Sequence, residues 1–175
     1  GLTGVPTGYV KLDEKTSGWQ SSDLVIIAGR PAMGKTSFAL SLAKNIAVDY
    51  HVPIAFFSLE MNNVQLVNRL ISNVCEIPGN KMLNGQLTPD EWDRLDKRIG
   101  NLQGAPLYID DTPGLSIFEL RTKARRLVKE KGVKILMIDY LQLMNANGMK
   151  FGSRQEEVSK ISQSLKGLAK ELDIP

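Results

Sequence analysis

The residues from Gly29 to Thr36 have the types and the spacing of a phosphate-binding loop. Gly29, Gly34, Lys35 and Thr36 match the pattern G-x-x-x-x-G-K-[ST]. The two glycines let the backbone turn without Cβ clashes, so that successive N–H groups can point toward an anion. A helix that begins near Lys35 adds its unpaired N–H groups and the positive end of its dipole. We therefore expect the loop to bind a nucleoside triphosphate.

Separate roles are predicted for the side chains of this loop. Lys35 is expected to reach the β- and γ-phosphates and to act as a catalytic residue, while the Thr36 hydroxyl ligates Mg²⁺. The residues expected to surround the nucleotide are Gly29, Arg30, Pro31, Ala32, Met33, Gly34, Lys35, Thr36 and Ser37.

Short apolar segments along the chain alternate with segments of helical periodicity. The strand predictions cover residues 24–29, 54–59, 107–109 and 134–139. Two predicted helices start with capping boxes, Thr88 with Glu91 and Ser153 with Glu156. Helical spacing is seen in residues 38–47, and the capped helices carry one apolar stripe each, over residues 92–102 and 158–172, which predicts packing against a core. The alternation predicts an α/β fold with a mainly parallel sheet flanked by helices, and ligands at the carboxyl ends of the strands.

Carboxylates follow three of the predicted strands. Asp139 ends an apolar strand in the manner of a Walker B element, whose Asp holds Mg²⁺ beside the phosphates, and the alternative is a simple strand cap. Glu60 is suited to polarise an attacking water, and it is equally suited to the first turn of a helix. For the pair Asp110–Asp111, followed by Thr112-Pro113-Gly114, turn formation is the preferred explanation.

Size and composition restrict the class of protein. A chain of 175 residues is one domain with a substantial core, and no apolar run approaches the length of a membrane span. Its single cysteine, Cys75, excludes an internal disulfide and fits a reducing cytoplasm. The net charge of +3 permits a nucleic-acid partner without requiring one.

Two segments contain concentrated basic residues. In the segment from Arg121 to Lys131, the apolar stripe of its predicted helix leaves Arg121, Lys123, Arg125, Arg126 and Lys129 largely outside, and a solvated face is preferred over a DNA track. Residues 145–154 are rich in Gly and Asn and contain Lys150 and Arg154. This segment either faces DNA phosphates or is an ordinary loop, and the sequence does not favour one over the other.

Taken together, several sequence blocks resemble one known family. They are Gly8–Asp13, Asp23–Thr36, Ser58–Met61, Ile138–Met144 and Arg154–Leu172. The strings "AGRPAMGKT", "SLEM" and "IDYLQLM" are highly specific in combination. Over nearly its whole length, the chain resembles the C-terminal ATPase domain of DnaB-type bacterial replicative helicases.

The resemblance implies a RecA-like P-loop NTPase fold that works as a homo-hexameric ring around single-stranded DNA. It implies ATP and Mg²⁺ as cofactors, with Lys35 and Thr36 on the phosphates and the metal, and Asp139 on the metal's water shell. Glu60 is implied to be the catalytic carboxylate. Translocation from 5′ to 3′ and partners such as primase and a helicase loader are also implied.

The resemblance also implies elements that this sequence does not contain. Residues 1–175 are expected to form an incomplete ATPase domain that continues beyond Pro175 with a strand, a DNA-contacting loop and an Arg supplied to the neighbouring subunit. That strand would lie between the predicted strands 24–29 and 134–139, so apolar surface and unpaired backbone groups are expected to be exposed there.

Two other functions stay open beside a helicase motor. One is a RecA-like recombination or repair ATPase, from which strand displacement on a forked substrate would distinguish a helicase. The other is an ATP-dependent module that only remodels an oligomer, and DNA-stimulated ATP hydrolysis would be absent from it.

Overall fold

The central strand of the sheet is β1 (Ile54–Ser58), and all five of its residues are buried. In this computed structural model β2 (Leu107–Asp110) pairs with one edge of β1 and β3 (Ile135–Asp139) with the other, and both pairings are parallel. A strand covered on both faces must be apolar on both faces. The uninterrupted apolar run in β1 is explained by this position.

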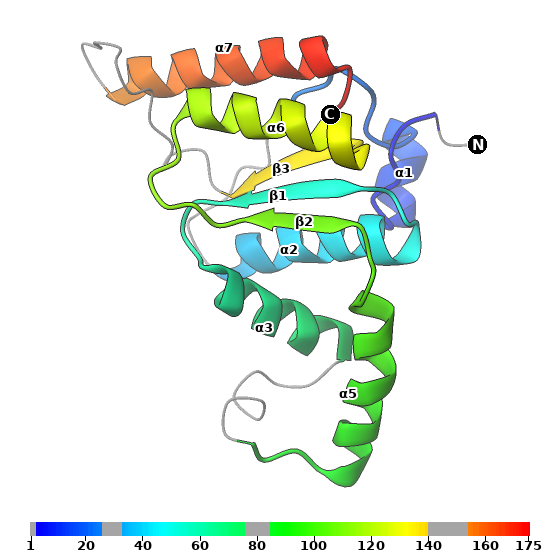
Figure 1. The fold of residues 1–175 in the computed structure, drawn as a ribbon. Coiled ribbons are helices and arrows are strands. Elements are labelled where there is room, and N and C mark those ends of the chain that lie inside the picture. Colours follow the sequence, from blue (N-terminus) through cyan, green and yellow to red (C-terminus); the bar gives the residue numbers. More distant parts are fainter. Residues whose placement is uncertain (1–2, 26–32, 76–84, 140–153) are drawn as a thin grey trace.

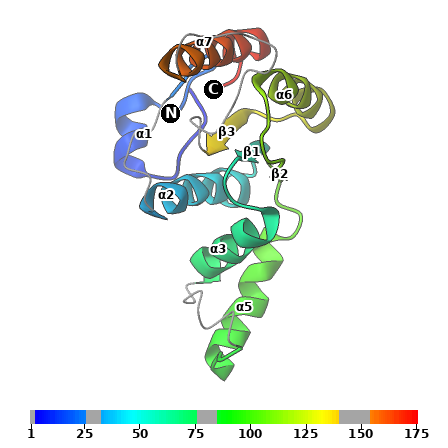
Figure 2. The ribbon, with the colours of Figure 1, turned by 90° about the vertical axis from the view of Figure 1, so that its left-hand side faces the viewer.

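Helices cover both faces of the sheet, as Figures 1 and 2 show. Helices α6 and α7 lie on one face, α2 lies on the other, and α3 and α5 extend from the α2 side away from the sheet. The structure describes residues 3–25, 33–75, 85–139 and 154–175. The helices within these ranges are α1 (Val10–Thr16), α2 (Met33–Lys44), the π-helix η1 (Asn45–Asp49), α3 (Asn63–Cys75), α5 (Pro89–Leu102), α6 (Ile117–Lys131) and α7 (Arg154–Leu172).

The core is divided by the sheet into two apolar clusters. Alternate side chains of a strand point to opposite faces, so Ala55 and Phe57 of β1 enter one cluster while Ile54 and Phe56 enter the other. The first cluster contains the inner faces of α6 and α7, including the predicted stripe residues Ile161, Leu165 and Leu168. The second contains Leu40, Leu42, Ala43 and Ile46 from α2 and η1, together with Leu66 of α3. This double burial fixes the positions of the strand ends.

Three of the four predicted strands are confirmed within one or two residues at each end. The prediction for residues 24–29 differs, because Leu24 and Val25 belong to no strand and are 36% and 45% exposed. No described strand lies beside them to pair with their backbone. The remainder of that prediction falls outside the described residues.

The capping box at Thr88 is confirmed. The Thr88 hydroxyl accepts a hydrogen bond from the Glu91 amide at 3.2 Å, and the Glu91 carboxylate accepts one from the Thr88 amide at 3.1 Å. The box predicted at Ser153 lies outside the described residues, as does the side chain of Cys75. In the described part of the chain, no helix has the length and apolar character that crossing a membrane requires.

The stripe predicted for residues 92–102 is only partly buried. Leu95 is buried against Ile71, Leu87 and Ile99, but Trp92 is 50% exposed. The prediction that Trp92 packs in the core is therefore wrong. The reason is that α5 packs on α3 rather than on the sheet. One helix covers only part of the apolar stripe, and Trp92 lies in the part that stays exposed.

Candidate active site

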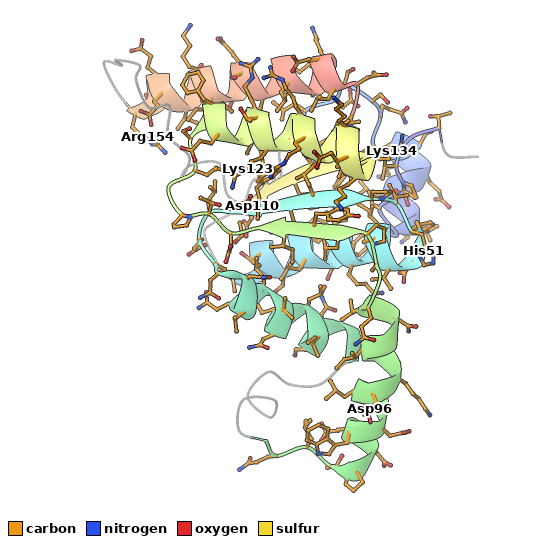
Figure 3. The ribbon with its side chains drawn as sticks, in the orientation of Figure 1. His51, Asp96, Asp110, Lys123, Lys134 and Arg154 are labelled. Carbon is orange, nitrogen blue, oxygen red and sulfur yellow. The ribbon has the colours of Figure 1, made fainter. Side chains whose placement is uncertain are left out.

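All three strands end at the same rim of the sheet because they are parallel. Ser58 at the end of β1 is opposite Asp139 at the end of β3, and Phe57 is opposite Asp110 at the end of β2. Figure 3 shows Asp110, Lys123 and Arg154 toward this rim, while His51 and Lys134 lie toward the opposite one. We call the edge that contains Ser58, Asp110 and Asp139 the carboxyl rim.

A hydrogen bond at the carboxyl rim joins α2 to β3. The Thr36 hydroxyl, in the first turns of α2, donates to Asp139 Oδ2 at 3.0 Å. Thr36 is 7% exposed and Asp139 is 3% exposed, so both oxygen atoms belong to a largely dehydrated site. The last residue of the G-x-x-x-x-G-K-[ST] pattern therefore lies directly beside the carboxylate that ends β3.

The other loop residues are only partly described. Gly29, Arg30, Pro31 and Ala32 lie outside the described residues, and the side chains of Met33 and Lys35 are likewise not described. The backbone of residues 33–37 forms the start of α2, so the helix begins two residues before the predicted start near Lys35. Ser37 is exposed at this end of the helix.

Glu60 lies in a tight turn between β1 and α3. The Ser58 hydroxyl donates to the Met61 carbonyl at 2.7 Å and accepts from the Met61 amide at 3.2 Å. On the β3 side, the Leu59 amide donates to the Asp139 carbonyl at 2.8 Å. Glu60 is exposed and directly follows Leu59, the residue bonded to the Asp139 backbone. Because α3 begins only at Asn63, the alternative that places Glu60 in the first helical turn is wrong.

The carboxylate that ends β2 and the one that follows it have different partners. Asp110 Oδ1 accepts from the Thr112 amide at 3.0 Å, which confirms turn formation at this residue. Lys123 Nζ donates to Asp110 Oδ2 at 2.7 Å and to the Thr112 hydroxyl at 2.8 Å. Burial by itself raises the pKa of the Asp110 carboxyl, but the bonds from Lys123 and Thr112 and the Lys123 charge outweigh it. The pKa therefore lies below its ordinary value.

Asp111 is bonded to a different element. Its Oδ2 atom accepts a hydrogen bond from the Asn63 amide at 2.7 Å, at the first residue of α3. No sequence signal within residues 110–114 indicated this contact, because it joins residues 48 positions apart. A local signal did exist in Asn62-Asn63-Val64-Gln65, which fits a capping box and forms one, with reciprocal bonds between Asn62 and Gln65 of 2.9 and 3.1 Å.

The predicted basic face of α6 is less solvated than expected. Lys123 has 29% of its side chain exposed and is paired with Asp110, while the Nε atom of Arg121 is buried. Arg125 is paired with Glu171 of α7 at 3.0 Å. The assignment of Lys123 to an outer face is therefore wrong, because its ammonium is bonded to Asp110 and Thr112, and Arg121 is only half-exposed. Arg126 and Lys129 are exposed as predicted.

In the other basic segment, Lys150 lies outside the described residues. Arg154 begins α7 and forms an ion pair with Glu157.

Comparison with known proteins identifies the family. The DnaB-like helicase C-terminal domain family matches residues 4–175. The chain belongs to this family. The expectation drawn from the sequence blocks is thereby confirmed.

Relatives of this DnaB-like domain share almost half of its residues. It is 47% identical over 174 residues to the replicative DNA helicase DnaB of Geobacillus stearothermophilus, and 45% identical over 174 residues to the replicative DNA helicase DnaC of Bacillus subtilis (strain 168). Both alignments cover 99% of this chain and 38% of the relative. The chain thus spans well under half the length of these relatives.

Solved structures agree with the assignment. A DnaB-like replicative helicase, described with its interactions with primase, superposes with a TM-score of 0.90 at 36% identity, over 99% of this chain and 42% of that chain. A second solved structure, that of an ATPase domain, gives the same TM-score and identity over 99% of this chain and 62% of that one. The expected RecA-like α/β fold is confirmed by these similarities.

Proposed function

We propose that this DnaB-like domain is the motor of a replicative DNA helicase, which hydrolyses ATP to move along single-stranded DNA and unwind duplex. The observation that supports the proposal most directly is the buried 3.0 Å bond between Thr36 and Asp139. It links the start of the phosphate-loop helix to a strand-end carboxylate, the two parts that P-loop enzymes use to hold a metal–phosphate group.

The two oxygen atoms at this contact are suitable ligands for Mg²⁺. Thr36 and Asp139 offer a hydroxyl and a carboxylate oxygen, which are the hard ligands that this ion prefers. Mg²⁺ usually binds through one or two protein ligands and completes its shell with water and phosphate oxygens, so two protein oxygens are sufficient. When bound, the ion would neutralise charge developing on the β- and γ-phosphate oxygens.

The residues of this chain then have distinct roles in hydrolysis. The backbone N–H groups of residues 29–34, apart from Pro31, which has none, would bind the phosphates, and the Lys35 ammonium would interact with the β- and γ-phosphate oxygens. Glu60 accepts a proton from the water that attacks the γ-phosphorus, while the bond to the β-phosphate oxygen breaks. Support for the role of Glu60 comes from its exposed position in a turn bonded to the Asp139 backbone.

The proposed partners follow from the family. We propose single-stranded DNA as the track, a homo-hexamer as the working assembly, and primase and a helicase loader as protein partners, all in the cytoplasm. One solved relative is described with its interactions with primase, which supports that partner. The extent of the ATPase domain along the chain stays a prediction.

The test uses the full-length protein and two matched variants. We expect the wild-type protein to hydrolyse ATP faster with single-stranded DNA and to separate a forked duplex. Glu60→Gln should lower the kcat of ATP hydrolysis by about 10² to 10⁴-fold, because the proton acceptor is lost, and should retain ATP binding. Glu130→Gln, the same change at an exposed residue near the far end of α6, should leave both activities unchanged.

Each other result identifies a different function. Hydrolysis that DNA does not stimulate would indicate an ATP-dependent assembly module. DNA-stimulated hydrolysis without strand separation would indicate a recombination or repair ATPase. A Glu60→Gln variant that hydrolyses ATP at the wild-type rate would remove Glu60 from the proposed mechanism.

A further inference from the structure

The turn that contains Glu60 is held by backbone contacts on the side of β3. The Leu59 amide donates to the Asp139 carbonyl at 2.8 Å, immediately before Glu60. Immediately after it, both backbone groups of Met61 are bonded to the Ser58 hydroxyl, which is 1% exposed. These bonds fix where the turn starts, but they do not fix its exit into α3.

The exit is fixed by the capping of α3. The first amides of a helix have no partner within the helix and need acceptors from elsewhere. The Asn62 side chain accepts from the Gln65 amide at 2.9 Å. The Asn63 amide, at the first helical residue, is bonded to Asp111 Oδ2 at 2.7 Å. This short, charge-assisted bond also places a negative charge at the positive end of the helix dipole.

The Asp111 carboxylate comes from a rigid support. Strand β2 runs parallel to β1, and Phe57 is opposite Asp110, so Asp111 follows the strand at the level of Ser58. The preceding residue, Asp110, is bonded to Lys123 at 2.7 Å and to the Thr112 amide at 3.0 Å. Figure 3 shows the Asp110 and Lys123 side chains directed toward each other. Asp111 consequently follows a residue that is held by both the sheet and α6.

We infer that Asp111 is a positioning residue for ATP hydrolysis, which orients Glu60 by holding the first turn of α3 against the end of β2. This inference rests on the proposed function. Asp111 does not touch the reacting atoms in this arrangement and acts through the Glu60 turn. The requirement is geometric, because displacing a catalytic group by about 1 Å costs up to roughly 10²-fold in rate.

The test is steady-state ATP hydrolysis by the full-length protein with single-stranded DNA. Asp111→Ala should lower kcat by about tenfold to a hundredfold and change the KM for ATP by less than about twofold, since nucleotide binding is unaffected. Asp111→Asn keeps an acceptor oxygen at the helix start and should restore most of the lost kcat. Asp93→Ala removes an exposed carboxylate from α5, where it pairs with Lys97 at 3.1 Å, and should leave kcat unchanged.

Other outcomes overturn the inference. A kcat for Asp111→Ala within twofold of wild type, a loss carried by KM alone, or no recovery in Asp111→Asn would each do so. Should Asp111→Ala fail to fold, Asn63→Pro removes the donor of the same bond. Proline is tolerated at the first helical position and carries no N–H, so the same loss of kcat is expected, and a wild-type kcat contradicts the inference.

The failures of the two proposals are distinguishable. A wild-type protein that does not hydrolyse ATP overturns the proposed function and this inference together. An active wild-type protein that loses activity in Glu60→Gln but not in Asp111→Ala or Asn63→Pro overturns the inference alone.

Discussion

At the scale of single residues, the contact between Thr36 and Asp139 joins positions 103 residues apart in the chain. A hydroxyl and a carboxylate that are each less than a tenth exposed require partners, since burial without a hydrogen bond is costly. Each group satisfies the other, which holds the start of α2 against the end of β3. The same pair of oxygen atoms is the proposed Mg²⁺ site, so one contact has a structural and a proposed functional role.

A prediction at this scale concerns Lys123 and Asp110. Lys123→Met should lower the free energy of unfolding of the full-length protein by about 1 kcal/mol at neutral pH, because it removes a partly buried, charge-assisted hydrogen bond. Because the pKa of the Asp110 carboxyl is lowered in the folded protein, the ion pair stabilises the fold at pH values above the ordinary pKa of 3.8. This stabilisation is lost as the pH falls through the folded-state pKa of Asp110. Urea unfolding followed by circular dichroism measures the change at neutral pH and at an acidic pH below the folded-state pKa of Asp110.

The control is Lys97→Met on α5, where the pair with Asp93 has 75% and 68% of its side chains exposed. Exposed pairs contribute little, so this variant should resemble wild type at both pH values. If Lys123→Met were as destabilising in acid as at neutral pH, the ion pair would not be the source of the effect.

Part of the site is predictable from the sequence at the level of single residues. Asp139, Glu60 and Asp110 follow apolar runs, and parallel strands bring such ends to one rim, so their common location could be expected. The bonds from Lys123 to Asp110 and from Asn63 to Asp111 could not, because they depend on how α6 and α3 approach the end of β2. Long-range side-chain contacts of this kind leave no periodic pattern in the sequence.

At the scale of secondary-structure elements, α5 shows how a local signal determines a helix start. Thr88→Ala removes the acceptor for the Glu91 amide and should destabilise the start of α5 by about 1 kcal/mol. Hydrogen exchange of the α5 amides in the full-length protein measures this, and faster exchange is expected in the first turn. Thr122→Ala, within α6, should leave α5 unchanged, because the Thr122 hydroxyl bonds to the Phe118 carbonyl of its own helix. Equal exchange in Thr88→Ala and wild type would contradict the capping role.

Local sequence patterns predicted the strands but not the burial of every helix face. The strands β1, β2 and β3 follow from short apolar runs bounded by polar or turn residues. The helical spacing of residues 38–47 is confirmed, and its last residues lie in the π-helix η1, which follows α2 directly. The exposure of Trp92 depends on what α5 packs against, which its own stripe does not specify. Tertiary packing therefore decided the case of Trp92, in which the local pattern was wrong.

At the scale of the whole molecule, DNA binding is expected to depend strongly on salt. A side chain that neutralises one phosphate of single-stranded DNA contributes about 0.7 to the slope of log affinity against log salt concentration. If residues 145–154 face the DNA, Lys150→Ala in the full-length protein should reduce that slope by about 0.7. Fluorescence anisotropy with a labelled oligonucleotide at several salt concentrations measures it. Lys97→Ala on α5 is the control, and an unchanged slope in Lys150→Ala defeats the assignment.

The bond between Asn63 and Asp111 has a consequence for engineering this protein. This bond joins residues 48 positions apart, so it closes the segment of the chain that contains α3 and α5. Gly85 is exposed within this segment, with no described atom within 4 Å of the position that a Cβ would occupy. Doubling the length of a flexible loop adds only about 0.6 kcal/mol of closure entropy. A peptide tag or reporter inserted at Gly85 would therefore cost little stability. The bond between Asn63 and Asp111 would still hold the two ends of the segment together.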